Sequence, residues 1–109
     1  MRELLARDVE FDAVFGLNDT LALGAMRVLQ EAGYRVPQDV SVIGFDDLPA
    51  SAYRLPPLTS VRQSIGELGD RSAQAILQLI DGNRPRFAPP PVELVIREST
   101  DRSGRRGRS

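Results

Sequence analysis

Two short apolar runs on either side of one amphipathic segment constrain the fold of this chain most strongly. The runs are AVFGL, residues 13–17, and VSVIGF, residues 40–45. Continuous apolar runs of this length are typical of strands that are buried on both faces. From Thr20 to Ala32 the apolar residues recur at helical spacing, and Gly33 follows as a residue that ends a helix. The order strand, helix, strand forms a βαβ unit, so the sequence predicts an α/β fold with two parallel strands.

The flanking segments predict shorter elements. Residues 4–9 resemble the end of a helix, and LPASAYRLPP, residues 48–57, is expected to form a loop. The segment LTSVRQ, residues 58–63, is predicted to be extended. Ser64 with Glu67 predicts a capping box that opens a helix. The stripe of this helix comprises Leu68, Ala75, Ile76, Leu79 and Ile80, and Gly82 ends it.

The remaining segments continue this order. NRPRFAPPP, residues 83–91, contains too many prolines for regular structure. VELVI, residues 92–96, is expected to form the last strand. Residues 101–109 carry four arginines and almost no apolar residue, so they are predicted to be disordered.

The composition excludes several kinds of chemistry. The 109 residues include no cysteine and no histidine, and all fourteen basic residues are arginines. Disulfides, thiolate or imidazole catalysis and zinc sites built on these ligands are therefore excluded. Ser41, Ser51 and Ser60 have no histidine to activate them. The net charge of -1 gives no reason to expect a nucleic acid or an anionic membrane as a partner. We predict no catalytic residue, no metal site and no cofactor.

Polar side chains follow both predicted strands. Asn18 and Asp19 come after the first strand, and Asp46 and Asp47 come after the second. Ligands of parallel α/β sheets bind at the carboxyl ends of the strands, so we expect Asn18 and Asp46 to project into one crevice. An amide beside a carboxylate suits a neutral ligand that is rich in hydroxyl groups.

Structural interpretations of the same residues remain open. Asn18 or Asp19 could cap the helix that follows them, and Asp47 could cap the turn before Pro49. A catalytic dyad of Asp46 and Asp47 is disfavoured, because neighbouring residues of an extended chain point in opposite directions. A magnesium site made by these two residues and Asp19 is disfavoured by the absence of lysine.

Three segments carry motifs that are specific as a set. They are VFGLNDTLALGAMRVLQEAGYRVPQDVSVIGFDD, PPLTSVRQSIGELGDRSA and VELVIREST, within roughly residues 12–100. Together they closely resemble the lactose/galactose-repressor family of bacterial transcription regulators. The resemblance implies part of a periplasmic-binding-protein-like (type I), three-layer αβα fold with a parallel sheet. It also implies a cytoplasmic homodimer that binds a small-molecule effector, a sugar, between two lobes. DNA would be bound only through a helix-turn-helix that these residues lack.

The resemblance also implies roles for individual residues. Asn18 and Asp46 match effector-binding positions, and Asp19 and Asp47 match supporting positions at the strand tips. The implied dimer interface comprises Leu21, Leu23, Gly24, Arg27, Tyr53, Arg54 and Leu55.

The resemblance further divides the chain between two lobes. Residues 1–62 match the latter part of the C-terminal lobe, residues 63–91 a helix and connection of the N-terminal lobe, and residues 92–100 a returning strand. The helix of residues 64–80 would lack its own lobe, so we expect it to fold back on the chain or to dock on a second copy.

The expected function is the effector-binding and dimerisation part of such a regulator. One alternative keeps the fold and makes the chain part of a sugar-binding protein of a transport system. A second alternative is an α/β enzyme that uses Asp46 and Asp47 on a phosphorylated substrate. A third is a truncated product with no activity of its own.

Overall fold

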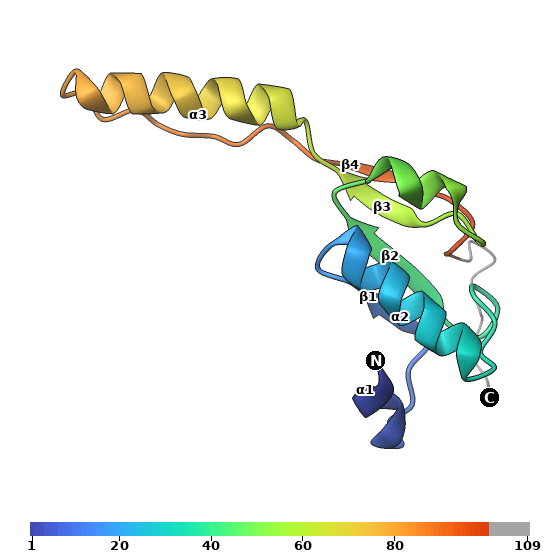
Figure 1. Cartoon of the computed structure of the whole chain (residues 1–109). Helices are drawn as coiled ribbons and strands as arrows, with labels where there is room; N and C mark the ends of the chain where they lie inside the picture. Colours follow the sequence, from blue (N-terminus) through green and yellow to red (C-terminus); the bar gives the residue numbers. More distant parts are fainter. Residues whose placement is uncertain (101–109) are drawn as a thin grey trace.

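A four-stranded sheet forms the centre of the molecule. The computed structural model describes residues 1–100 (Figure 1). The strands lie in the order β1 (Ala13–Phe15), β2 (Ser41–Phe45), β3 (Thr59–Arg62) and β4 (Glu93–Val95). The first three strands are parallel, and β4 is antiparallel to β3. The predicted α/β class and the βαβ unit are confirmed. The sheet departs from a purely parallel one at β4, because the chain leaves β3 and returns to β4 at the same end of the sheet.

Helix α2 (Asp19–Glu31) covers one face of β1 and β2. Its Ala22, Met26 and Leu29 are buried against the sheet, in a core that also contains Val36, Val40, Val42 and Leu58. Gly33 follows the helix with a φ of 88°, a left-handed conformation that glycine adopts without steric cost. The helix and its predicted end are therefore confirmed, with bounds one residue earlier than expected.

The opposite face of the sheet is not covered by any element of residues 1–100. Side chains alternate between the two faces of a strand, so Phe15, Ile43, Phe45, Val61 and Leu94 share this second face. Phe15 is 55% exposed and Leu94 is 53% exposed. The expectation that AVFGL is buried on both faces is wrong, because β1 is an edge strand with a helix on one side.

Helix α3 (Ile65–Ile80) extends away from the sheet, as Figure 1 shows. None of its residues is buried. Residues 81–92 run back beside it, and the Arg71 guanidinium donates to the carbonyl of Ala88 at 2.9 Å. The predicted capping box does not form, since Ser64 makes no side-chain cap and Glu67 pairs with Arg71. The folding back of α3 onto the rest of the chain does not occur.

Two short helices complete the described part. Helix α1 (Arg2–Ala6) ends earlier than the residues 4–9 expected, and Met1 and Leu5 pack against the core. The segment predicted as a loop contains a 3-10 helix, η1 (Pro49–Tyr53), which begins at a proline. The predicted disorder of residues 101–109 lies outside the described residues. Among residues 1–100, no helix is both long and apolar enough to span a membrane.

The close approach of α2 to β2 yields a test of the packing. A Cβ at Gly44 would lie 2.3 Å from the Asp19 carboxylate and 3.0 Å from Leu58. We expect Gly44→Ala to lower the free energy of unfolding by about 1–3 kcal/mol, because the overpacked backbone must shift. Urea unfolding followed by circular dichroism measures the change. Gly24→Ala is the control, since its Cβ meets no atom within 4 Å, and it should raise stability by up to about 1 kcal/mol. Equal effects at the two glycines would contradict this packing.

Candidate functional site

The carboxyl ends of β1 and β2 lie at the same edge of the sheet. Phe15 is the register partner of Ile43, and the amide of Gly16 donates to the Ile43 carbonyl at 2.8 Å. Asn18 follows the end of β1 by three positions, and Asp46 follows β2 directly. The structure therefore brings the two residues predicted to bind a ligand to one edge.

Asn18 is the N-cap of α2. Its backbone is extended, and its Oδ1 accepts a hydrogen bond from the amide of Leu21 at 2.8 Å. This bond satisfies one of the helix amides that has no partner within the helix. The capping interpretation is thus confirmed for Asn18. Because the carbonyl oxygen is engaged, the side chain has its Nδ2 amide hydrogens to offer to a ligand.

Asp46 stands exposed at the tip of β2. Its amide donates to the carbonyl of Val61 at 2.9 Å, and its Oδ1 accepts from Gln63 Nε2 at 3.2 Å. Its φ of 105° is rare for a residue with a side chain. Such strain is held only where the surrounding structure fixes the backbone, as the bond to Val61 does here. Within residues 1–100, its Oδ2 accepts no hydrogen bond, so this oxygen can accept a ligand hydroxyl.

Asp19 is completely buried and joins three parts of the chain. Its carboxylate accepts hydrogen bonds from the hydroxyls of Ser51 and Ser60, both at 2.5 Å, and from the amide of Leu48 at 2.7 Å. The Ser60 hydroxyl in turn accepts from the amide of Asp47 at 3.0 Å. The interpretation of Asp19 as a helix cap is wrong, because its carboxylate points into the sheet and Asn18 makes the cap.

Asp47 is paired with two arginines. Its side chain is 7% exposed, and its oxygens lie 2.7 Å from Arg62 Nε and 2.6 Å from an Arg97 nitrogen. Burial alone would raise the pKa of Asp47, but the hydrogen bonds and charges of Arg97 and Arg62 outweigh it and hold that pKa below its ordinary value. The interpretation of Asp47 as a cap of the turn before Pro49 is wrong, since the Leu48 amide is bound by Asp19 instead.

The two neighbouring acids have separate environments. Asp46 and Asp47 both have positive φ, so the chain turns at this point rather than continuing as a strand. Asp47 is fastened by arginines, whereas Asp46 is exposed and meets Gln63. The two do not form a carboxylate dyad. In the described part of the chain, no group of three or more acidic side chains is placed to hold a metal ion.

The strand ends form an open edge rather than a closed crevice. Asp46 is exposed and Asn18 is half-buried. A cavity of about 470 Å³ lies elsewhere, beside Val36, Pro37, Pro56 and Arg97, and another of about 210 Å³ lies beside α3. Neither cavity includes Asn18 or Asp46. Asn18 and Asp46 therefore lie on an open surface, and the crevice expected between them is not closed by residues 1–100.

The residues of the predicted dimer interface lie on the outer side of α2 and on the segment that contains η1. Tyr53 is 86% exposed, Leu55 85% and Leu21 55%. Gly24, Arg27 and Arg54 are also exposed, and Gln30 Nε2 holds the two segments together through the Leu55 carbonyl at 2.9 Å. Arg27 pairs with Glu31 on its own helix. Leu23 differs from the others, because it is half-buried against the core.

Several residues of this edge were missed by the sequence interpretation. They are Ser51, Ser60, Arg62, Gln63 and Arg97, which bind the acidic residues. The predicted extended segment LTSVRQ could have indicated two of them. Pairing it in parallel with the preceding strand would have placed its last two residues, Arg62 and Gln63, beside the acidic tip.

The lowered pKa of Asp47 makes the free energy of unfolding depend on pH. A carboxylate whose pKa is lower in the folded state stabilises the protein above its unfolded pKa of about 4, and this contribution is lost as the pH falls through the folded value. We expect Asp47→Asn to cost about 2–4 kcal/mol at pH 7, because it leaves Arg97 with a weakened partner in a half-buried site. The loss of stability between about pH 5 and 2 should also become shallower.

Urea unfolding at a series of pH values measures both effects. Glu31→Gln is the control, because it removes an ion pair on the exposed surface and should change stability little. An Asp47→Asn protein with the stability and pH profile of the unchanged chain would contradict the role of this ion pair.

Comparison with known proteins identifies the family. The family model described as periplasmic binding protein-like domain matches residues 2–100. The HTH-type transcriptional repressor PurR of Mannheimia succiniciproducens is 44% identical over 102 residues, which are 91% of this chain and 30% of that protein.

Solved structures agree with this match. A LacI-type transcription regulator from Bifidobacterium animalis subsp. lactis has a TM-score of 0.80 at 35% identity, over 92% of this chain and 36% of that one. The lac repressor dimer bound to operator and the anti-inducer ONPF has a TM-score of 0.77 at 39% identity, over 90% and 35%. The chain thus spans about a third of the length of these regulators. It belongs to the periplasmic binding protein-like domain family, in the form found in LacI-type transcriptional regulators.

Proposed function

We propose that this chain is the effector-binding and dimerisation part of a LacI-type regulator, acting in the cytoplasm on a sugar-like small molecule. Residues 1–62 and 92–100 would supply one wall of the effector cleft, and residues 63–91 would belong to the opposite lobe. DNA would be bound by a helix-turn-helix that lies outside this sequence. The chain would bind its ligand without transforming it.

The observation that carries the proposal is the division of labour among the polar residues of the strand ends. The carboxylates of Asp19 and Asp47 are already bound within the protein. Asp19 accepts hydrogen bonds from two serine hydroxyls and a backbone amide, and Asp47 is paired with two arginines. The Nδ2 of Asn18 and the Oδ2 of Asp46 are left to face solvent. One offers donors and the other accepts, so together they suit hydroxyl groups held in a fixed geometry.

The charges of the edge favour a neutral ligand. Asp46 carries an exposed negative charge, and the nearby Arg62 is already paired with Asp47. A free phosphate would be repelled by Asp46 and would find no glycine-rich loop to hold it. Ligand contacts that exist only when the two lobes close would shift the population toward the closed arrangement.

Dimerisation would use the outer side of α2 and the segment 53–55. Tyr53, Leu55 and Leu21 are exposed apolar side chains, and buried aromatic residues contribute strongly to protein interfaces. The similar lac repressor structure is that of a dimer. Arg27 and Arg54 would lie at the polar rim of this interface.

Two other functions are less well supported. The regulators described above favour sensing over a sugar-binding protein of a transport system. An enzyme acting through Asp46 and Asp47 would need these carboxylates to converge, and their partners hold them apart.

Asn18 offers a way to separate ligand binding from folding. Asn18→Asp keeps an oxygen that caps α2 and removes the amide donor, whereas Asn18→Ala removes both. We expect Asn18→Asp to retain the stability of the chain and to weaken effector binding by about 10-fold or more. Asn18→Ala should also lose about 1 kcal/mol of stability. Titration calorimetry with a panel of neutral mono- and disaccharides measures binding, and urea unfolding measures stability.

Asp46→Asn provides the complementary variant. It keeps the size and the turn preference of the residue but removes the charge, so it should weaken binding of the same sugar without unfolding the chain. Ala50→Ser, on the exposed part of η1, serves as a neutral control. Sugar binding that is unchanged in both Asn18→Asp and Asp46→Asn would rule out this edge as the effector site.

A further inference from the structure

Two consecutive acidic residues with positive φ form the turn after β2. Asp46 has a φ of 105° and Asp47 has a φ of 51°. Aspartate tolerates the second value better than most residues do. The first value lies further from the conformations that a residue with a Cβ prefers, so it persists only where neighbouring contacts maintain it.

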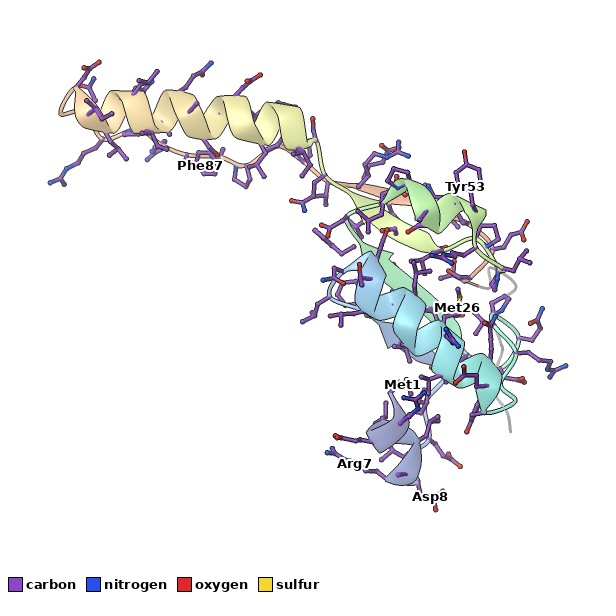
Figure 2. The ribbon with its side chains drawn as sticks, viewed as in Figure 1. Met1, Arg7, Asp8, Met26, Tyr53 and Phe87 are labelled. Carbon is purple, nitrogen blue, oxygen red and sulfur yellow. The ribbon has the colours of Figure 1, made fainter. Side chains whose placement is uncertain are left out.

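An extended backbone at this position would direct the Asp46 side chain to a different place. Side chains alternate along a strand, so Val42, Gly44 and Asp46 would share one face if β2 continued. That face is covered by α2, whose Met26 packs in the core (Figure 2). A Cβ at Gly44 would already meet the Asp19 carboxylate there. The turn with positive φ instead leaves Asp46 exposed at the edge of the sheet.

The backbone of the turn is bound to β3. The amide of Asp46 donates to the Val61 carbonyl at 2.9 Å, and the amide of Asp47 donates to Ser60 Oγ at 3.0 Å. Each neutral hydrogen bond contributes a net free energy similar in size to the strain of one residue with an unfavourable φ. Contacts of the charged Asp47 side chain, which are stronger, therefore add the stabilisation that keeps the turn in this conformation.

Arg97 connects this turn to the chain that follows β4. Its amide donates to Thr59 Oγ1 at 2.8 Å, and its Nη1 donates to the Leu58 carbonyl at 2.8 Å. The same Nη1 lies 2.6 Å from Asp47 Oδ1. The two side chains of this ion pair are only 17% and 7% exposed, so solvent ions screen their attraction weakly. Asp47 is thereby fixed relative to the start of β3.

We propose that Asp47 and Arg97 are positioning residues for effector binding, because their ion pair holds the turn that directs the Asp46 carboxylate to the ligand. This role rests on the proposed function, since it requires Asp46 to contact the effector. Asp47 and Arg97 themselves do not touch the ligand. The role also explains what residues 92–100 add to the lobe of residues 1–62, which is the arginine that fastens the turn.

The size of the effect follows from the population of the turn. Without the ion pair, the turn exchanges with relaxed forms in which the Asp46 carboxylate points elsewhere. The apparent affinity for the effector then falls in proportion to the fraction of chains that keep the turn. The strain of one such residue corresponds to a factor of roughly 10 in population. We therefore expect sugar binding to weaken about 10-fold when the pair is broken.

Nuclear magnetic resonance of the chain without ligand measures the turn directly. The coupling between the amide and Hα protons of Asp46 differs between a φ of 105° and an extended backbone. Arg97→Gln removes the charge and keeps the backbone amide that donates to Thr59, and it should shift this coupling toward the extended value. Arg35→Gln is the matched control. It breaks the ion pair with Asp39, which lies before β2 rather than after it, and should leave the coupling unchanged.

Titration calorimetry with the sugar that the unchanged chain binds gives the second measurement. Arg97→Gln should weaken binding about 10-fold. Arg97→Lys keeps a charge but lacks the planar guanidinium, so it should weaken binding about 3-fold and shift the coupling less. Asp47→Asn combined with Arg97→Gln should bind no more weakly than the weaker single variant, because both changes break one pair. Arg35→Gln should keep the affinity of the unchanged chain. Circular dichroism checks that each variant is folded.

Three outcomes would overturn the proposal. The first is an Asp46 coupling that is the same in Arg97→Gln and in the unchanged chain. The second is a shifted coupling with unchanged sugar affinity, because the turn would then not determine binding. The third applies if Arg97→Gln does not fold, and it is an Arg97→Lys chain with unchanged coupling and affinity. If the unchanged chain binds no sugar, the proposed function fails, and the Asp46 coupling still decides whether Arg97 holds the turn.

Discussion

The buried carboxylate of Asp19 is the interaction on which the rest of the molecule depends. It joins the start of α2 to β3 through Ser60 and to the segment after β2 through Leu48 and Ser51. A buried charge is tolerated only when hydrogen bonds replace the water it has lost, and here three donors do so. Gly44 is required beside it, because any side chain would occupy the place of the carboxylate. The half-buried Asn18 and the exposed Asp46, on either side of it, receive their positions from this arrangement.

Local periodicity in the sequence correctly predicted several elements. The predictions were wrong where burial or strand direction depends on residues that are distant in the sequence. The βαβ unit, the glycine after α2 and the irregular proline segment follow from local patterns, and all are observed. The burial of β1 on both faces was wrong, because burial depends on which layers are present. The antiparallel course of β4 also depended on a distant event, the return of the chain along α3.

The candidate site divides in the same way. The positions of Asn18 and Asp46 followed from the rule that parallel strands end at one edge. The partners of the other two acids could not be predicted, because Arg97 and Asp47 are separated by fifty positions and meet only through the sheet. The failed capping box shows the limit of motifs, since Glu67 had an arginine one turn away that competed successfully for its carboxylate.

The hydrogen bond between Gln63 and Asp46 has a mechanical consequence. Gln63 stands two positions before the first residue of α3, where the chain passes from the sheet into this helix. A ligand that binds Asp46 Oδ1 must displace this amide or share it, whereas Oδ2 accepts no hydrogen bond from any other residue of 1–100. A ligand on Oδ1 would therefore break or share a contact at the point where the chain leaves the sheet for α3, next to the ion pair between Asp47 and Arg62.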